Sequence, residues 1–140
     1  GEVAPSNAQT SDETDTTVLS DTTPTADPNQ FSVKFYDYKT NELISKSNKN
    51  NLNEKMRASD DLIYMTSDNK MDSIDVEPSY VLLLSYLKDT SRDIWILVYV
   101  KGDDVYVQAD KRHANINLDT AGYDIYKSKY NKSQLEELMK

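Results

Sequence analysis

The fold is decided by the stretch from Tyr80 to Val107, YVLLLSYLKDTSRDIWILVYVKGDDVYV. Three apolar runs of strand length lie in it, separated by two short polar segments. The last two runs flank Lys101–Asp104 almost symmetrically, and Gly102 within that segment can take the positive φ that short turns require. The stretch therefore predicts a three-stranded antiparallel meander.

The middle run, Ile94 to Val100, is apolar at consecutive positions instead of alternating with polar residues. Both faces of this strand should therefore be covered, which places it in the centre of the sheet. The C-terminal segment is the expected cover, because Ser133 and Glu136 have the spacing of a capping box. The apolar residues of that segment fall on one helical face: Leu135, Leu138 and Met139.

Two strands and a helix are expected before the meander. Apolar and polar residues alternate from Phe31 to Tyr36, as in a half-buried strand. A short second strand follows at Leu43-Ile44. Asn51 and Glu54 approximate a capping box, which predicts a short helix near residues 51–58.

The rest of the chain completes the predicted fold. Ser67 to Lys70 resembles a loop, and alternation from Tyr123 to Lys127 predicts a last strand before the C-terminal helix. The fold class is therefore α+β: a mostly antiparallel sheet, a meander of about four to six strands, with a C-terminal helix and one short helix near residues 51–58.

Residues 1–30 differ in composition from the rest of the chain. They consist mainly of Thr, Ser, Asp, Ala, Asn and Pro, with six acidic residues and no Lys or Arg. Such a segment cannot bury enough apolar surface to offset the entropy of ordering. We therefore expect a disordered acidic leader over residues 1–30 and a single domain over residues 31–140.

The charge of the chain lies mostly in that leader. The whole chain has 24 acidic and 16 basic residues, whereas residues 31–140 have 18 and 16, a net charge of −2. A near-neutral domain gives no electrostatic reason to expect binding to nucleic acid or to anionic lipid. No apolar run approaches the roughly 20 residues that span a bilayer. The absence of cysteine excludes disulfides, thiolate catalysis and Cys-ligated metals.

Two clusters invite a chemical interpretation. Lys111-Arg112-His113 is the one basic cluster, and it predicts either an anion contact with His113 as acid or base, or an exposed loop after the strand at 105–109. The carboxylates between Asp68 and Glu77 suggest calcium, but Lys70 and Ser73 occupy positions that an EF-hand loop gives to an oxygen ligand and to glycine. We expect no catalytic set, metal site or cofactor.

Tyrosine is the compositional feature that best fits a binding role. All ten tyrosines lie after Phe31, most of them on or beside predicted strands. Their rings offer a large apolar body with a polar tip, so we expect a binding surface at Tyr86, Tyr99, Tyr106 and Trp95. The alternative is that these residues are strand formers half-buried in a small domain.

Several segments resemble the ectodomains of small secreted proteins or lipoproteins of Gram-positive bacteria, among them families of unknown function. They are the polar leader, the strand entry Pro78–Leu83, the hairpin Lys101–Val107 and the segment Gly122–Lys127 before the terminal helix. The resemblance implies a cell-surface or secreted location and assigns no catalytic residue. Membrane contact would then be made only through an anchor that this sequence does not contain.

These observations favour a non-enzymatic extracellular domain on a flexible stalk. We expect a monomer that binds a protein, a peptide or a cell-envelope component through a face or an edge of its sheet. The alternative is an envelope hydrolase or a small-molecule-binding domain that uses carboxylates and His113. An inhibitory or immunity module would give the same sequence features as the first hypothesis.

Overall fold

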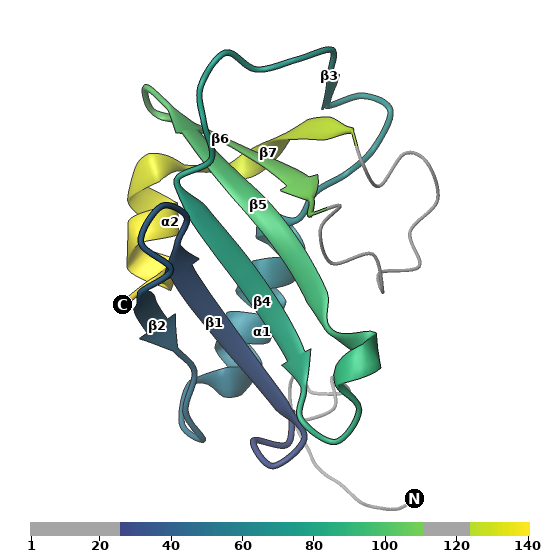
Figure 1. Cartoon of the computed structure of the whole chain (residues 1–140), viewed down its shortest axis with the longest axis vertical. Helices are drawn as coiled ribbons and strands as arrows, with labels where there is room; N and C mark the ends of the chain where they lie inside the picture. The colour runs from purple at the N-terminus through teal and green to yellow at the C-terminus, as the bar shows by residue number, and fades with distance from the viewer. Residues whose placement is uncertain (1–25, 111–123) are drawn as a thin grey trace, which may run out of the picture.

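The computed structural model describes residues 26–110 and 124–140. Within these residues a single antiparallel sheet has seven strands in the order β2-β1-β4-β5-β6-β7-β3, and two α-helices pack on it (Figure 1). The elements are β1 Phe31–Asp37, β2 Leu43–Lys46, α1 Leu52–Leu62, β3 Lys70–Met71, β4 Tyr80–Tyr86, β5 Ile94–Lys101, β6 Asp104–Ala109, β7 Ile125–Asn131 and α2 Lys132–Leu138. The predicted α+β class, with a mostly antiparallel sheet and a C-terminal helix, is confirmed.

The meander predicted from Tyr80 to Val107 is present as β4, β5 and β6. Leu82 lies opposite Ile96, and Val98 lies opposite Val107. Gly102 has a φ of 61° at the first of two turn positions between β5 and β6, where a type II′ turn favours glycine. The strand β5 is the fourth of the seven, so its predicted central place is also confirmed.

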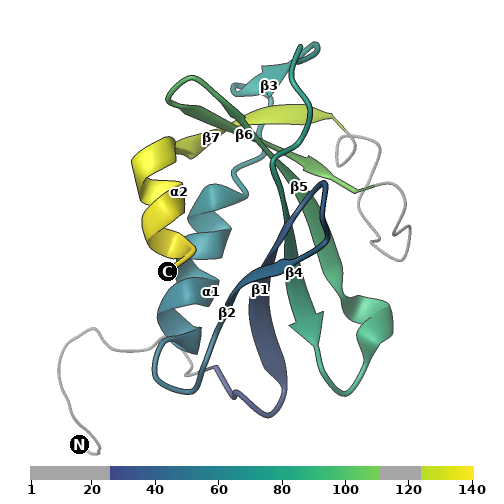
Figure 2. The same cartoon turned by 60° about the vertical axis from the view of Figure 1, so that its left-hand side comes forward.

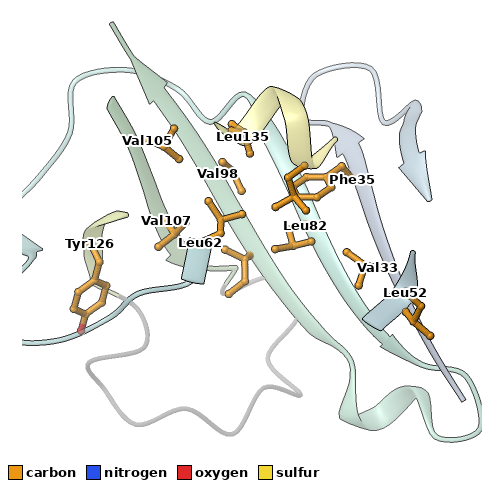
Figure 3. Packing of buried hydrophobic residues seen from close by; sticks show 12 residues of the cluster. Val33, Phe35, Leu52, Leu62, Leu82, Val98, Val105, Val107, Tyr126 and Leu135 are labelled. Atoms are coloured by element: carbon orange, nitrogen blue, oxygen red, sulfur yellow. The ribbon is translucent and has the colours of Figure 1, made fainter. Parts of the chain in front are cut away.

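The two helices lie on the same side of the sheet, as the rotated view shows (Figure 2). Alternate residues of the inner strands point to that side and are almost fully buried: Val33, Phe35, Leu82, Ile96, Val98, Val105 and Val107. Figure 3 shows all of these except Ile96 labelled, together with Leu62 of α1 and Leu135 of α2 in the same cluster. In the part of the chain that the structure describes, no α-helix covers the opposite side, which we call the helix-free face.

Helix α1 extends four residues beyond the predicted end at residue 58. Its buried positions, Leu52, Lys55, Ser59 and Leu62, continue at helical spacing to the last turn, so burial continues the helix past the predicted end. Asn51 stands at the N-cap position, but its side chain makes no capping bond to the helix. Its Oδ1 accepts the Asn48 N–H at 2.8 Å instead, so the capping box predicted with Glu54 is wrong.

The capping box predicted for the C-terminal helix is also misplaced. Asn131, the last residue of β7, caps α2 by accepting the N–H of Gln134, and the Gln134 side chain accepts the Asn131 N–H, both at 2.9 Å. Ser133 and Glu136 lie inside the helix. The prediction was wrong because β7 passes directly into α2, so the helix starts earlier.

The last strand in the order of the sheet is β3, and it lies in a region predicted to be a loop. Its two residues, Lys70 and Met71, pair with Tyr126 and Ile125 of β7. The side chain of Asn69 donates to the Lys127 carbonyl at 2.7 Å and fixes the start of this short pairing. The predicted last strand is β7, which begins at Ile125; Tyr123 lies outside the described residues.

The described chain contacts the domain before the first strand begins. The Ala26 N–H donates to Oδ1 of Asn53 at 3.1 Å, and the Gln30 carbonyl accepts the Leu87 N–H at 2.9 Å. The remaining residues of the predicted leader, 1–25, lie outside the described residues. Neither α1 nor α2 has the length and apolar character of a membrane-crossing helix, the described ranges alone being considered.

Candidate functional site

The strand β2 forms one edge of the sheet, and β1 is its neighbour. Lys46 lies opposite Lys34, and Ser45 lies opposite Phe35. The Ser47 N–H donates to the Val33 carbonyl at 2.8 Å. Because neighbours in an antiparallel ladder point their backbone groups in alternate directions, the N–H and C=O of Lys46 point away from β1. Across residues 26–110 and 124–140, no further strand lies on that side.

Two large apolar side chains stand on this edge. Leu43 is 52% exposed and Ile44 is 43% exposed. The pairing shifts by one residue between Phe35 and Tyr36, so Ile44 has no partner on β1. Such a bulge bends an edge strand and leaves one residue outside the ladder. Within the described residues, the edge of β2 is therefore unpaired and partly apolar.

Two lysines also meet at this edge. Val33 and Phe35 point to the helices, so Lys34 between them lies on the helix-free face, and its cross-strand partner Lys46 lies beside it. Like charges directly opposite each other on neighbouring strands destabilise a sheet. Within the described part of the chain, no ion pair joins a carboxylate to either lysine. We call Leu43, Ile44, Lys46 and Lys34 the β2 edge site.

The predicted aromatic surface is divided between the two faces. Trp95, Tyr99 and Tyr106 lie on the helix-free face, since Ile96, Val98, Val105 and Val107 point to the helices. Tyr86 lies on the helix side, where its ring and that of Phe31 form a T-shaped pair with centroids 5.0 Å apart, and the Arg92 guanidinium carbon lies 4.4 Å from the centre of the Tyr86 ring. The structure thus brings three of the four residues to one face and separates Tyr86.

The tyrosines of the helix-free face are mostly covered. Tyr99 and Tyr106 are opposite each other and only 7% and 8% exposed, whereas Trp95 is half-buried. The Tyr99 hydroxyl donates to Oε1 of Gln108 at 2.8 Å. Burial raises the pKa of Tyr99, and the nearby Tyr38 and Asp110 raise this pKa further. Tyr99 and Tyr106 therefore offer little surface to a partner.

The carboxylates between Asp68 and Glu77 do not form a joint site. Asp75 pairs with Lys101 at 2.8 Å, which lowers the pKa of Asp75 and raises the pKa of Lys101. Glu77 lies 4.0 Å from Lys39. Among the residues with described positions, no group of three His, Asp or Glu side chains is arranged to hold a metal. Lys111, Arg112 and His113 lie outside them.

Sequence reasoning missed a buried lysine between the helices. Lys55 is 7% exposed, and its ammonium donates to the carbonyl of Leu138, to that of Lys140 at 3.3 Å and to Oγ of Ser45 at 3.5 Å. Burial lowers the pKa of Lys55, and Glu54 partly opposes this shift. The position of Lys55 on the apolar stripe of α1, three residues after Leu52, was the available signal.

A cavity of about 380 Å³ adjoins this lysine. Tyr130, Glu54 and Glu137 are among its lining residues. Burial raises the pKa of Tyr130, and Asp61 and Glu54 add to the shift. An ammonium has three N–H donors, and those of Lys55 are directed to three acceptors of the protein. Lys55 therefore acts as a link between α1, β2 and the end of α2, with no donor left for a ligand.

Comparison of the chain with protein-family models, with curated proteins and with solved structures found no match. The structure alone therefore gives its class: an antiparallel α+β domain with both helices on one side of the sheet. Of the surfaces described above, the β2 edge site combines exposed apolar side chains with backbone and lysine charges that have no partner among residues 26–110 and 124–140.

Proposed function

We propose that this chain is a non-enzymatic extracellular domain that binds an extended segment of a protein or peptide by strand addition at β2. The observation that carries the proposal is the unpaired edge of β2, with the backbone of Lys46 directed outward and Leu43 and Ile44 exposed. An extended peptide beside such an edge gains main-chain hydrogen bonds, and alternate side chains supply specificity.

The opposite edge of the sheet is less suited to this role. It is formed by β3, which has only two residues, Lys70 and Met71. A strand rises about 3.3 Å per residue, so β3 offers a short template, while β2 offers twice as many residues. Exposed apolar side chains beside unpaired backbone are a recognised site for pairing with another chain.

An extracellular location and a stalk are part of the same proposal. They are supported by the composition of residues 1–30 and by the resemblance of the sequence to secreted proteins of Gram-positive bacteria. Protease treatment of intact cells that express the native gene tests them. Digestion of the protein at the cell surface, or its recovery from the medium, is the expected result, and full protection inside intact cells would contradict the location.

Strand addition can be tested at a single backbone group. Lys46→Pro removes the outward N–H and leaves the ladder to β1 intact, whereas Lys46→Ala removes the same charge and keeps the N–H. Peptides selected from a random decapeptide library against the full chain should bind the Ala variant and not the Pro variant. Equal binding by both variants would rule out strand addition at β2.

The small-molecule alternative has one observation in its favour. The cavity between α1 and α2 is large enough for a small ligand and is lined by the buried Lys55 and the half-buried Tyr130. A fragment screen followed by amide shifts at these two residues tests this alternative. The hydrolase version requires His113, so a His113→Ala variant with unchanged activity toward any hydrolysed substrate would eliminate it.

A further inference from the structure

We propose that the segment added at β2 is acidic, with a carboxylate that lies beside Lys46 on the helix-free face, where Lys34 on the next strand adds a second positive charge. The inference rests on the proposed function and deepens it, because it names the chemistry of the partner. Its basis is the pair of lysines that face each other across β1 and β2 without a carboxylate partner in the described chain.

The local charge of this edge is opposite to that of the whole protein. Residues 31–51 contain four lysines and two acidic residues, a net charge of +2 in a chain whose net charge is −8. Neither acidic residue forms an ion pair with Lys34 or Lys46 in the described chain. The Asp37 carboxylate accepts the N–H groups of Lys39 and Thr40 at 2.9 and 2.8 Å within its own turn. Glu42 belongs to the same turn, because its carbonyl accepts the Asp37 N–H.

The lysine pair also argues against a second copy of this chain as the occupant. If two β2 edges paired with each other around Lys46, the Lys46 side chains of the two copies would be neighbours on the same face, with Lys34 one strand behind each of them. Like charges on neighbouring strands repel, and lysine on an edge is a common device against such pairing. An acidic segment replaces this repulsion with attraction.

The spacing of the edge site defines a pattern for the partner. Lys46 and Leu43 both lie on the helix-free face, because their partners Lys34 and Tyr36 do. Ile44 is the extra residue of the bulge, so a regular strand places two alternate side chains against Lys46 and Leu43. The expected pattern is an acidic residue and an apolar residue separated by one position.

Peptide titrations of the full chain test the inference. The probe is an acetylated nonapeptide in which Asp alternates with Thr and Val around a central Leu, and two matched peptides carry Asn or Lys in place of every Asp. The acidic peptide should shift the amide resonances of residues 43–46 and bind about five- to tenfold more tightly than the Asn peptide, because exposed ion pairs contribute modestly. Added salt should remove this advantage.

A charge exchange provides the matched control. The Lys46→Glu variant should prefer the Lys peptide to the acidic one, which reverses the order found for the native chain. If the native chain binds the acidic and Asn peptides equally, and Lys46→Pro still abolishes binding, the acidic partner is overturned and strand addition survives. If none of the peptides, charged or neutral, shifts residues 43–46, the proposed function falls as well.

Two measurements on the free chain identify other occupants. The first is hydrogen exchange of the Lys46 amide with solvent. If this exchange is slow at low salt and fast at high salt, acidic residues of this chain itself occupy the edge. A molecular mass that doubles with concentration, and does so less in Lys46→Pro, would assign the edge to a second copy. Either result overturns an acidic partner supplied by another protein.

Discussion

At the scale of single residues, Lys55 joins parts of the chain that are distant in sequence. Its ammonium connects α1 to Ser45 of β2 and to the carbonyls of Leu138 and Lys140. Carbonyls at the end of a helix lack partners within the helix, and a cation there also interacts favourably with the helix dipole. Burial of this lysine is therefore compensated by hydrogen bonds with charged character.

Two substitutions of Lys55 should distinguish the contribution of its charge to stability from the contribution of its hydrocarbon stem. Lys55→Ala removes both and should lower the free energy of unfolding by about 2–4 kcal/mol, because it leaves a cavity and carbonyls without a donor. Lys55→Met keeps a stem of similar length, and we expect about half of that loss. Urea denaturation measures both variants, and a Met variant as stable as the native chain would show that the ammonium contributes no net stability.

Tyr99 should make stability depend on pH in the alkaline range. Its folded pKa is raised above the ordinary value of about 10, so its contribution is complete below pH 10 and is lost as the pH rises through the folded pKa. Tyr99→Phe lacks this ionisation and, at neutral pH, should be about 1 kcal/mol less stable because it loses the bond to Gln108.

The prediction for Tyr99 is tested by comparing the stability of the native chain with that of the Tyr99→Phe variant. Denaturation at a series of pH values should show the difference in stability narrowing above pH 10. Tyrosinate absorbance should show a component with a raised pKa missing or reduced in the variant. A difference that stays constant to the highest pH would contradict the assignment of the raised pKa to Tyr99.

At the scale of elements, the start of α2 depends on where the preceding strand ends. Asn131 with Gln134 and Ser133 with Glu136 are both acceptable capping boxes in sequence. The choice between them is made by β7, which places Asn131 at the turn into the helix. Local sequence signals were therefore sufficient to predict this helix but insufficient to locate its first residue.

The two candidate caps give a direct test. Asn131→Ala should lower the free energy of unfolding by about 1 kcal/mol, the usual contribution of an N-cap side chain. Ser133→Ala, inside the helix, should be neutral or slightly stabilising because alanine favours helix. Thermal or urea denaturation compares them, and a larger loss in the Ser133 variant would place the cap where the sequence suggested.

Reversal of the charge at position 46 of the edge strand should stabilise the domain. Lys46→Glu places opposite charges across β1 and β2 and should raise the free energy of unfolding by a few tenths of a kcal/mol. Lys49→Glu makes the same change in net charge outside the strand and serves as the control. Equal effects of both variants would mean that the Lys34–Lys46 pair has no local repulsion.

At the scale of the whole molecule, the sequence predicted those elements whose signal is local and strong. Dense apolar runs identified β4 and β5, and alternation identified β1. The two-residue β3 has no periodicity to detect, and it exists because β7 lies beside it. The edge position of β2 depends on the order of all seven strands, so the β2 edge site could not be found from Leu43-Ile44 alone.

The order of the strands predicts an order of amide exchange. Amides of β4 and β5, which have a strand on each side, should exchange only through global unfolding. The outward amide of Lys46 and the short β3 should exchange fastest among the strand residues. Hydrogen exchange followed by NMR measures this order, and protection of Lys46 equal to that of Val98 would contradict the edge assignment.

The place of β7 between β6 and β3 also has a consequence for synthesis on the ribosome. Neither β3 nor the far side of β6 can complete its pairing until residues 125–131 have been translated, and Leu135 of the core comes later still. A nascent chain that ends before this point leaves Leu62 and Val107 without their last neighbours. We therefore expect that the domain closes only when residues through α2 have emerged, and that chaperones protect it until then.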